Sequence, residues 1–472
     1  MKNRLAQKAV TLAICMVALM VGLMLIGDVV KDRIHNRDRA VQSVINSTAG
    51  PQTIYGPTLV QLCTKEVTSK DTEGRTETKL VSFQRIALPD DVQHLAKAQM
   101  QARSRGLHQV NTFVLNDQLS ARFNAGNQLQ GKPESNHVRQ CDAPRLILPI
   151  SDPRGIRQAT LQVNGQELAL EAGTGHSSYT RGLQSKPLPA KFDSNAPLKI
   201  QLKLELLGTE RVGFVPLGGN NQVSMQADWP HPSFGGNFLP STRNISNTSF
   251  DAAWNISALA SSARQGFMQG KPLCTAVAPD AGYDQESSHC LEQFGTSFID
   301  PVNPYTLSDR ATKYGLLFAA LTFVAVAMFE VLKKLRVHPV QYLLVGSALC
   351  IFFLLLISLS EHIGFERAYV VAACACVLLM GYYASHILAS IKRGLPFAGL
   401  IALMYGLLFV LLQLEQTALV VGSLAMFAVL TIVMVATRKV DWYAFGKGDS
   451  ASLPTQPTAV GAAFTSPGKE PA

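Results

Sequence analysis

The stretch AVTLAICMVALMVGLMLIG, residues 9–27, decides the architecture of this chain. It carries no charged side chain, and as a helix it is long enough to cross the roughly 30 Å hydrocarbon core of a bilayer. A secretory signal peptide would have a shorter apolar core and a small-residue cleavage site, and Leu25-Ile26-Gly27-Asp28 offers no such site. We therefore expect an uncleaved signal anchor that forms the first transmembrane helix.

Five more apolar segments crowd into the last third of the chain. They are Tyr314–Leu332, Val340–Leu359, Ala368–Leu388, Phe397–Leu414 and Ala418–Ala436. The long sequence between the first and second apolar segments is polar and rich in strand-forming residues. The sequence thus predicts a membrane α-helical protein with six transmembrane helices, and a large β-rich periplasmic domain inserted between helices 1 and 2.

Basic residues set the orientation of these expected spans. The chain has 472 residues and a formal net charge of +9. Much of the excess lies in short clusters beside apolar segments: Lys2, Arg4 and Lys8; Lys333, Lys334 and Arg336; Lys392 and Arg393; Arg438 and Lys439. The positive-inside rule places such clusters in the cytoplasm, so both termini are expected there. Because the membrane accounts for the charge, no nucleic-acid partner is expected.

These assignments divide the chain into five parts. They are residues 1–8, a cytoplasmic N-terminus; 9–27, transmembrane helix 1; 28–312, the periplasmic β-rich domain; 313–437, a five-helix transmembrane bundle; and 438–472, a cytoplasmic tail. From Gly446 onward the tail is rich in Pro, Ser, Gly and Ala. It has too few large apolar residues to fold and is expected to be largely disordered.

Alternation of apolar and polar residues predicts the strands of the outer domain. Leu198–Leu206 alternates without a break, as a half-buried strand does. Asn164-Gly165 between alternating arms predicts a hairpin. Many short strands with Gly and Pro punctuation favour an antiparallel sandwich or two smaller β modules, and the pattern does not choose between them. Before the strands, Arg33–Ile45 has apolar residues near helical spacing and is expected to continue the first helix outward.

Four cysteines fall in this outer domain: Cys63, Cys141, Cys274 and Cys290. An oxidising compartment permits disulfides, and three connectivities are possible. Cys274 and Cys290 would close the smallest loop and are the candidate pair, with four free buried thiols as the alternative. Their spacing is too wide for zinc, so no metal site is predicted.

Short strings along the chain resemble those of one known family. They are STAGPQ at 47–52 with YGP at 55–57, DPRGI at 152–156, DWPHPSF at 228–234 with FLP at 238–240, DRATKY at 309–314, HPVQYLLVG at 338–346, LSEHIGF at 359–365 and VDWY at 440–443. In this order, and over about residues 1–445, the chain resembles the CreD family of bacterial inner-membrane proteins, also called cell envelope integrity proteins.

The resemblance implies an inner-membrane protein of Gram-negative bacteria that is induced through a two-component regulator. It also implies a link to envelope integrity, to tolerance of a nuclease colicin and, in some species, to the β-lactam response. It does not imply a reaction.

Two motifs are candidate sites in the outer domain. His231 and the flanking aromatic residues Trp229 and Phe234 could form a recognition surface. The two neighbouring prolines favour instead a rigid corner whose aromatic rings close the core. Arg154 could receive a carboxylate or a phosphate, although a structural turn is the favoured interpretation of its Pro- and Gly-containing string.

Three residues of the predicted bundle are notable. Glu361 and His362 lie at the external mouth of the third span, where they could relay protons or bind a cation or headgroup, or simply cap the helix. Glu330 precedes Lys333 and Lys334 at helical spacing, so a surface ion pair explains it. No charged residue is committed to the centre of a span, which argues against a transporter.

No Walker A, HExxH or GxSxG motif occurs in the sequence. We therefore expect a protein that is not an enzyme and has no cofactor, with the lipid bilayer and a periplasmic or envelope protein as partners. Two other hypotheses stay open. One is an enzyme or transporter acting on lipid or cell-wall intermediates through Glu361 and His362. The other is a sensor that modulates a membrane kinase through the tail or the basic loops.

Overall fold

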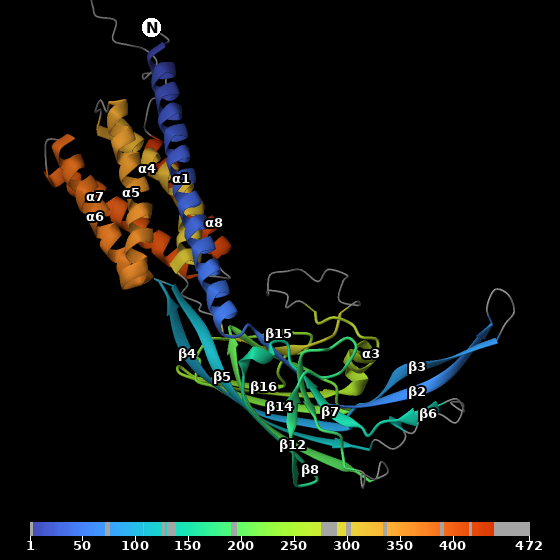
Figure 1. Cartoon of the computed structure of the whole chain (residues 1–472). Coiled ribbons are helices and arrows are strands. Elements are labelled where there is room, and N and C mark those ends of the chain that lie inside the picture. The colour runs from blue at the N-terminus through green and yellow to red at the C-terminus, as the bar shows by residue number, and fades with distance from the viewer. Residues whose placement is uncertain are drawn as a thin grey trace, which may run out of the picture. The chain divides into compact units, whose positions relative to one another are not determined.

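The computed structural model of the chain describes residues 3–70, 76–106, 108–124, 128–129, 138–189, 196–274, 290–298, 304–333, 338–387, 391–414 and 418–438. They belong to two compact units, which are described separately. The helical unit comprises residues 1–31 and 304–472, and the β-rich unit comprises residues 32–303 (Figure 1). The tail from Gly446 onward, predicted to be disordered, lies outside the described residues.

Helix α1 (Asn3–Ser47) contains the predicted anchor and continues well beyond it. Its course through residues 33–45 agrees with their helical spacing. Near its end, Val41 and Val44 pack against Val110 of the β-rich unit. The Thr48 hydroxyl donates back to the Val44 carbonyl at 2.6 Å. The helix does not continue past Gly50-Pro51, because proline has no N–H to donate.

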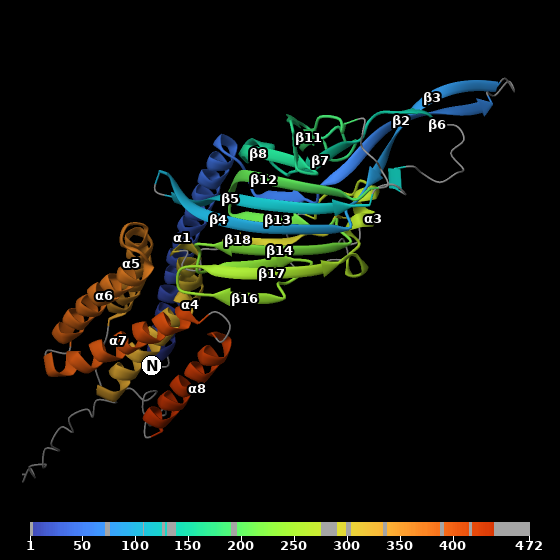
Figure 2. The same cartoon turned by 90° about the horizontal axis from the view of Figure 1, so that it is seen from below.

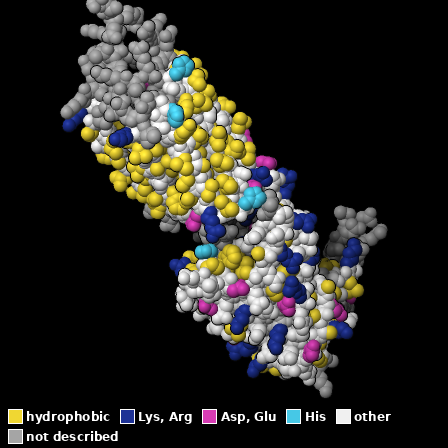
Figure 3. Space-filling model, turned by 90° about the vertical axis from the view of Figure 1, so that its left-hand side faces the viewer, with side chains coloured by type: hydrophobic (Ala, Val, Ile, Leu, Met, Phe, Trp, Pro, Cys, Tyr) yellow, Lys and Arg dark blue, Asp and Glu magenta, His cyan; other side chains and the backbone are white. Residues whose placement is uncertain are grey.

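Five further helices lie in the described part of the helical unit. They are α4 (Pro304–Lys333), α5 (Pro339–Ile363), α6 (Phe365–Ile387), α7 (Ile391–Gln413) and α8 (Ala418–Thr437). Within the described residues, α1 and α4 to α7 are long and apolar enough to span a membrane, and α8 has a shorter apolar part, Val420–Val435. Hydrophobic side chains cover most of the described part of the face of this unit that Figure 3 shows. Helix α4 begins before Tyr314, because an apolar run marks the part that can cross a membrane rather than the helix ends.

Two of the strings quoted above start and end helix α5. His338 is its N-cap: the ring accepts a hydrogen bond from the Val340 N–H at 3.3 Å, and the Gln341 side chain accepts from the His338 N–H at 3.0 Å. At the other end, Gly364 separates α5 from α6 with a φ of +79°. Such a backbone conformation favours glycine.

The largest sheet of the β-rich unit has eight strands, seen side by side in Figure 2. In sheet order they are β16 (Thr242–Ile245), β17 (Phe250–Ser257), β14 (Asn220–Ala227), β4 (Asp91–Arg105), β5 (His108–Phe123), β12 (Leu198–Thr209), β8 (Ile156–Val163) and β9 (Gln166–Leu168). Strand β12 alternates buried and exposed residues through Lys203, as predicted. The predicted hairpin joins β8 to β9, with Asn164 at φ 49° and Gly165 at φ 80°.

Two smaller sheets complete this unit. The six-stranded sheet contains β10 (Leu170–Ala172), β11 (Gly182–Ser185), β7 (Arg145–Pro149), β2 (Thr58–Lys70) and β3 (Thr76–Ala87), with β6 (Val138–Cys141) paired to β2. The four-stranded sheet is ordered β1 (Gln52–Tyr55), β13 (Arg211–Val215), β18 (Phe294–Phe298) and β15 (Pro232–Gly236). One continuous core joins residues of all three sheets.

The expectation of an antiparallel sandwich or two smaller modules was too simple. The three sheets form one compact unit, and β1 pairs with β13 and β4 with β14 in parallel. Parallel partners need long crossover connections, and alternation along a strand does not reveal its neighbour. The other strand pairs described are antiparallel, as predicted.

The structure pairs the outer-domain cysteines as Cys63–Cys141 and Cys274–Cys290. The second pair closes the smaller loop, with a sequence separation of 16 against 78 for the first. Cys63 and Cys141 lie opposite each other in the register of β2 and β6. The cysteines of the helical unit (Cys15, Cys350, Cys374 and Cys376) are free.

Candidate functional site

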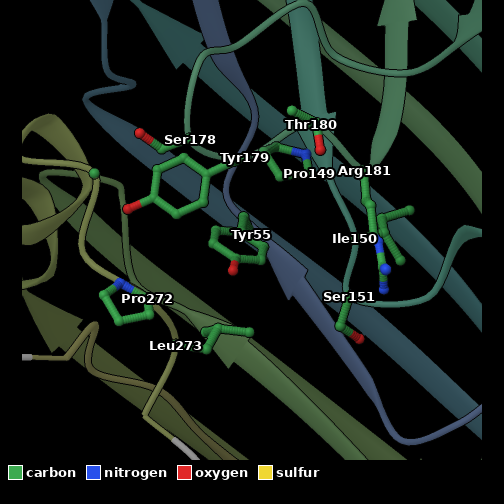
Figure 4. Close-up of a pocket in the computed structure, with 11 residues that line it drawn as sticks. Tyr55, Pro149, Ile150, Ser151, Ser178, Tyr179, Thr180, Arg181, Pro272 and Leu273 are labelled. Atoms are coloured by element: carbon green, nitrogen blue, oxygen red, sulfur yellow. The ribbon is translucent and has the colours of Figure 1, made fainter.

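A pocket of about 390 Å³ in the β-rich unit is the candidate site (Figure 4). It is lined by Tyr55, Pro149, Ile150, Ser151, Ser178, Tyr179, Thr180, Arg181, Gly270, Pro272 and Leu273. We call it the Tyr55–Tyr179 pocket. Its volume falls within the range of about 300–1,000 Å³ that is usual for small-molecule sites.

Four segments that are distant in sequence build this pocket. Tyr55 is the last residue of β1, and residues 149–151 lie at and just beyond the end of β7. Residues 178–181 belong to the connection between β10 and β11, and residues 270–273 follow α3 (Ala263–Met268). Figure 4 shows Tyr55 near the centre, with Tyr179 on one side and Ile150 and Arg181 on the other.

The end of α3 turns the chain into the pocket wall. The Lys271 N–H donates to the Gly266 carbonyl, and the Gly270 N–H donates to the Phe267 carbonyl, both at 3.0 Å. Gly270 has a φ of +69°. These bonds form a Schellman motif, whose left-handed position favours glycine. Pro272 follows and cannot continue the helix.

Two lining residues, Tyr55 and Tyr179, belong to an aromatic cluster with Phe267. The Tyr179 ring lies on the Phe267 ring with centroids 4.5 Å apart and planes 6° apart, and the Tyr55 ring centroid is 5.3 Å from that of Tyr179. Burial raises the pKa of Tyr179 to about 12. Burial also raises the pKa of Tyr55, and the neighbouring Tyr179 raises it further. Both phenols are therefore neutral at pH 7 and can donate or accept hydrogen bonds.

A buried histidine shapes the connection that carries Tyr179. The Nδ1 atom of His176 accepts hydrogen bonds from the N–H groups of Ser178 at 3.0 Å and Tyr179 at 3.3 Å. The Thr174 hydroxyl accepts from the His176 N–H at 3.1 Å and donates to the Tyr179 carbonyl. Burial lowers the pKa of His176, which favours the neutral ring. Its proton then lies on Nε2, a buried atom without a hydrogen-bond partner in the described part of the chain.

The pocket offers one cation and three uncommitted hydroxyl groups. Arg181 is exposed and is the one charged residue of the lining. Its guanidinium makes no hydrogen bond or ion pair with the described residues. The same holds for the hydroxyl groups of Tyr55, Ser178 and Thr180. These groups are therefore available to a ligand.

The two remaining hydroxyl groups of the lining hold the pocket together. The Tyr179 hydroxyl donates to the Lys271 carbonyl at 2.7 Å, which joins the connection after β10 to the segment after α3. The Ser151 hydroxyl donates to the Pro51 carbonyl at 3.0 Å and accepts from the Thr53 N–H at 2.8 Å. These bonds hold the end of β7 against β1.

Hydrogen bonds and a disulfide hold the pocket wall after α3 to residues 290–293. The Leu291 N–H donates to the Pro272 carbonyl at 2.7 Å, and the Cys274 N–H donates to the Leu291 carbonyl at 3.2 Å. The Gln293 side chain donates to the Cys274 carbonyl at 2.5 Å. The Cys274–Cys290 disulfide links the same two segments covalently.

Arg154 lies in a different part of the β-rich unit and is occupied. Its guanidinium donates to both Asp152 carboxylate oxygens, at 2.9 and 2.6 Å, and to the Asn46 carbonyl at the end of α1 at 3.1 Å. Burial alone would raise the pKa of Asp152, but hydrogen bonds from Arg154 and from the Gly50 N–H lower it overall. This is the geometry of the structural turn, and it fastens the end of α1 to the strands.

Trp229 and His231 lie between β14 and β15. The indole of Trp229 donates to the His231 carbonyl at 3.0 Å, and the half-buried Trp229 packs against the core. His231 is exposed. Phe234 contacts Trp254 with ring centroids 5.7 Å apart. The aromatic residues therefore form the corner, and the imidazole of His231 is left at the surface.

Glu361 and His362 lie in the last turn of α5 in the helical unit. Glu361 is half-buried and His362 is exposed. Adjacent residues on a helix point about 100° apart, so the two side chains lead away in different directions.

Glu330 does not lie at the surface as predicted, and its expected pairing with Lys333 and Lys334 stays a prediction. Its side chain is buried, with 8% exposed, and its carboxylate accepts a hydrogen bond from the Tyr342 hydroxyl at 2.9 Å. Spacing along one helix could not show which side of α4 meets α5. The Lys333 and Lys334 side chains lie outside those that the structure describes.

Of the pocket residues, only Tyr55 belongs to a string that stands out in the sequence, YGP at 55–57. The other lining residues lie in connections that have no periodic pattern, so no signal in one sequence brings them together. Among the described residues, no group of three or more His, Cys, Asp or Glu side chains could hold a metal.

The profile of the family described as "Inner membrane protein CreD" matches residues 4–443. The chain belongs to the CreD family. The inner membrane protein CreD of Escherichia coli strain K12 is 32% identical over 454 residues, which cover 94% of this chain and 95% of that protein. The expected family is thus confirmed, and this CreD-family chain carries several helices able to span a membrane.

Solved structures add no argument about this CreD-family chain. An M1 zinc metallopeptidase from Deinococcus radiodurans matches 36% of this chain and 39% of the peptidase, with 13% identity and a TM-score of 0.21. A mutant of that peptidase matches the same shares with 11% identity and a TM-score of 0.20. Scores this low establish neither a shared fold nor a shared activity.

Proposed function

We propose that this CreD-family chain crosses the inner membrane six times and presents its β-rich unit to the periplasm, where the unit binds a component of the envelope. Five helices of spanning length and the apolar α8 support the number of spans. The basic clusters beside the apolar segments support cytoplasmic termini. Two disulfides support an oxidising surrounding for the β-rich unit, because cytosolic thiols are kept reduced.

The observation that carries the binding function is the Tyr55–Tyr179 pocket. Apolar walls with a few convergent polar groups are typical of a site that binds a small molecule or a protruding group of a larger partner. The lining contains no Asp, Glu, His or Cys that could act as a general base or a strong nucleophile. We therefore assign the pocket to binding rather than to catalysis.

The same proposal connects binding to the physiology that the family resemblance implies. An inner-membrane protein that engages an envelope component would support envelope integrity and influence colicin tolerance and the β-lactam response. Its induction through a two-component regulator would then raise the amount of binding protein under envelope stress.

Complementation of a deletion strain with full-length variants tests this function. Thr180 lines the pocket and is exposed, so Thr180→Trp should fill the opening with little effect on folding. The matched control is Gln222→Trp, at an exposed position of β14. We expect Thr180→Trp to abolish complementation at normal membrane abundance, whereas Gln222→Trp should complement.

A second variant separates this proposal from a site in the bundle. Glu361→Ala combined with His362→Ala should complement if the pocket carries the function. Loss of complementation in this variant, together with full activity of Thr180→Trp, would move the function to the helical unit and overturn the proposal.

A further inference from the structure

The charge of the Tyr55–Tyr179 pocket limits what it can hold. Arg181 is the single charged residue of the lining, so the site has a net positive charge. Three other arginines of the same unit are paired: Arg145 with Glu171 at 3.4 Å, Arg154 with Asp152 at 2.6 Å and Arg157 with Glu205 at 3.3 Å. The guanidinium of Arg181 makes no such pair with the described residues. A guanidinium recognises carboxylate and phosphate groups through two parallel hydrogen bonds.

The remaining polar groups suit a hydroxylated or amide-bearing body beside that anion. Tyr55, Ser178 and Thr180 line the pocket, and their hydroxyl groups have no partners among the described residues. Each can donate one hydrogen bond and accept others. Tyr55 is only 6% exposed, so its hydroxyl would meet a ligand at the buried end of the site.

The walls and the volume set the size of the ligand. Pro149, Ile150, Pro272 and Leu273 present apolar surfaces without competing charges. A volume of about 390 Å³ lies in the lower part of the range of about 300–1,000 Å³ that is usual for small-molecule sites, so one substituted ring fits in this space.

We propose that the Tyr55–Tyr179 pocket binds a small organic anion, in which a carboxylate or phosphate pairs with Arg181 and a single hydroxylated ring lies against the Pro272–Leu273 wall. The inference rests on the proposed binding function and names its ligand class. The carboxylate and phosphate forms share the chemistry that Arg181 recognises, so matched probes distinguish them.

Three amino sugars with the same ring provide that test. N-Acetylglucosamine is neutral, N-acetylmuramic acid adds a carboxylate and N-acetylglucosamine 1-phosphate adds a phosphate. Each is titrated by calorimetry into the purified full-length protein in detergent. We expect at least one anionic sugar to bind about tenfold or more tightly than the neutral sugar, and the tighter of the two identifies the preferred anion.

Variants assign the difference to the pocket. Arg181→Gln should remove the preference for the anion, whereas Arg145→Gln, which breaks an exposed ion pair on β7, should retain it. Thermal unfolding of each variant verifies that it is folded.

Two outcomes would overturn the inference. Equal binding of the neutral and anionic sugars, abolished by Thr180→Trp, would refute the anion but leave the pocket as a binding site. Failure of all three sugars to bind would refute this ligand class, and the binding function would then depend on the complementation result for Thr180→Trp alone.

Discussion

The two units of this chain bury polar side chains in different ways. In the β-rich unit, His94 and Asp117 are 3% and 1% exposed and lie 2.7 Å apart inside the core, next to the ring of Phe214. In the helical unit, the described interior is largely apolar. Its buried carboxylate, that of Glu330, accepts a hydrogen bond from the Tyr342 hydroxyl. The strands can therefore hold internal polar groups that the helices largely avoid. This difference allows the β-rich unit to form a polar site.

The largest effect should come from breaking the buried pair of the β-rich unit. His94→Leu leaves the Asp117 carboxylate buried, and its Oδ1 atom already has no hydrogen-bond partner in the described structure. Removing one partner of such a buried pair typically costs about 3–5 kcal/mol. We expect a loss of this size in the free energy of unfolding, followed by tryptophan fluorescence during denaturation of the full chain.

The double variant His94→Leu with Asp117→Leu provides the control for that experiment. Removing both partners replaces the pair with apolar side chains, so much of the lost stability should return. Equal stability of the single and double variants would show that the two side chains are not coupled.

The two disulfides of the β-rich unit should differ in their effects: one mainly on stability, the other mainly on the pocket. Cys63–Cys141 closes the longer loop, and in the chain-entropy description its removal should cost about 4.5 kcal/mol, against about 3 kcal/mol for Cys274–Cys290. We expect the unfolding midpoint to fall further when Cys63 and Cys141 are both replaced by serine than when Cys274 and Cys290 are. Loss of anionic sugar binding should be larger for the second pair, because Cys274 adjoins the pocket wall. The reverse ranking in binding would separate this disulfide from the site.

The Tyr342–Glu330 hydrogen bond of the helical unit should contribute less to the free energy of unfolding. Tyr342→Phe removes one hydrogen bond to the buried Glu330 carboxylate, and the loss of one such bond typically costs about 0.5–1.5 kcal/mol. Exposed Leu378→Ala, on α6, should change stability by less than about 0.5 kcal/mol. Unfolding in mixed micelles measures both. A double variant with Glu330→Gln should be less than additive if the two groups act together.

The predictable parts of the fold are those with a period. The apolar runs revealed the long helices, and alternation with Asn164-Gly165 revealed β12 and the hairpin of β8 and β9. Parallel pairing of β4 with β14 was not predictable, because a strand's own residues do not specify a neighbour so far along the chain.

The site was less predictable than the fold for a related reason. Several strings quoted for the family lie at turns and helix ends, such as Asp152 at the turn before β8 and His338 at the start of α5. Such positions need particular residues locally, so they are recognisable in one sequence. Tyr179, Arg181 and Pro272 meet only because β7, β11 and α3 are folded around them. Their identity is tied to distant contacts rather than to local conformation.

The smallest expected effect concerns pH and the connection that carries Tyr179. Because burial lowers the pKa of His176 below its ordinary value of 6.5, the unfolded chain binds a proton more readily than the folded one. The contribution of the neutral His176 ring to the stability of the folded state is complete well above pH 6.5. It is lost as the pH falls below 6.5, by at most about 1.4 kcal/mol per pH unit for one proton.

Hydrogen exchange of the Ser178 and Tyr179 amides should therefore accelerate, relative to intrinsic rates, between pH 7.5 and 5.5. In His176→Asn, the side chain can still accept a hydrogen bond from the Ser178 N–H but does not titrate. The acceleration at low pH should therefore disappear in this variant. The exposed His231→Asn should leave it unchanged, and an acceleration that persists in His176→Asn would assign the pH dependence to another group.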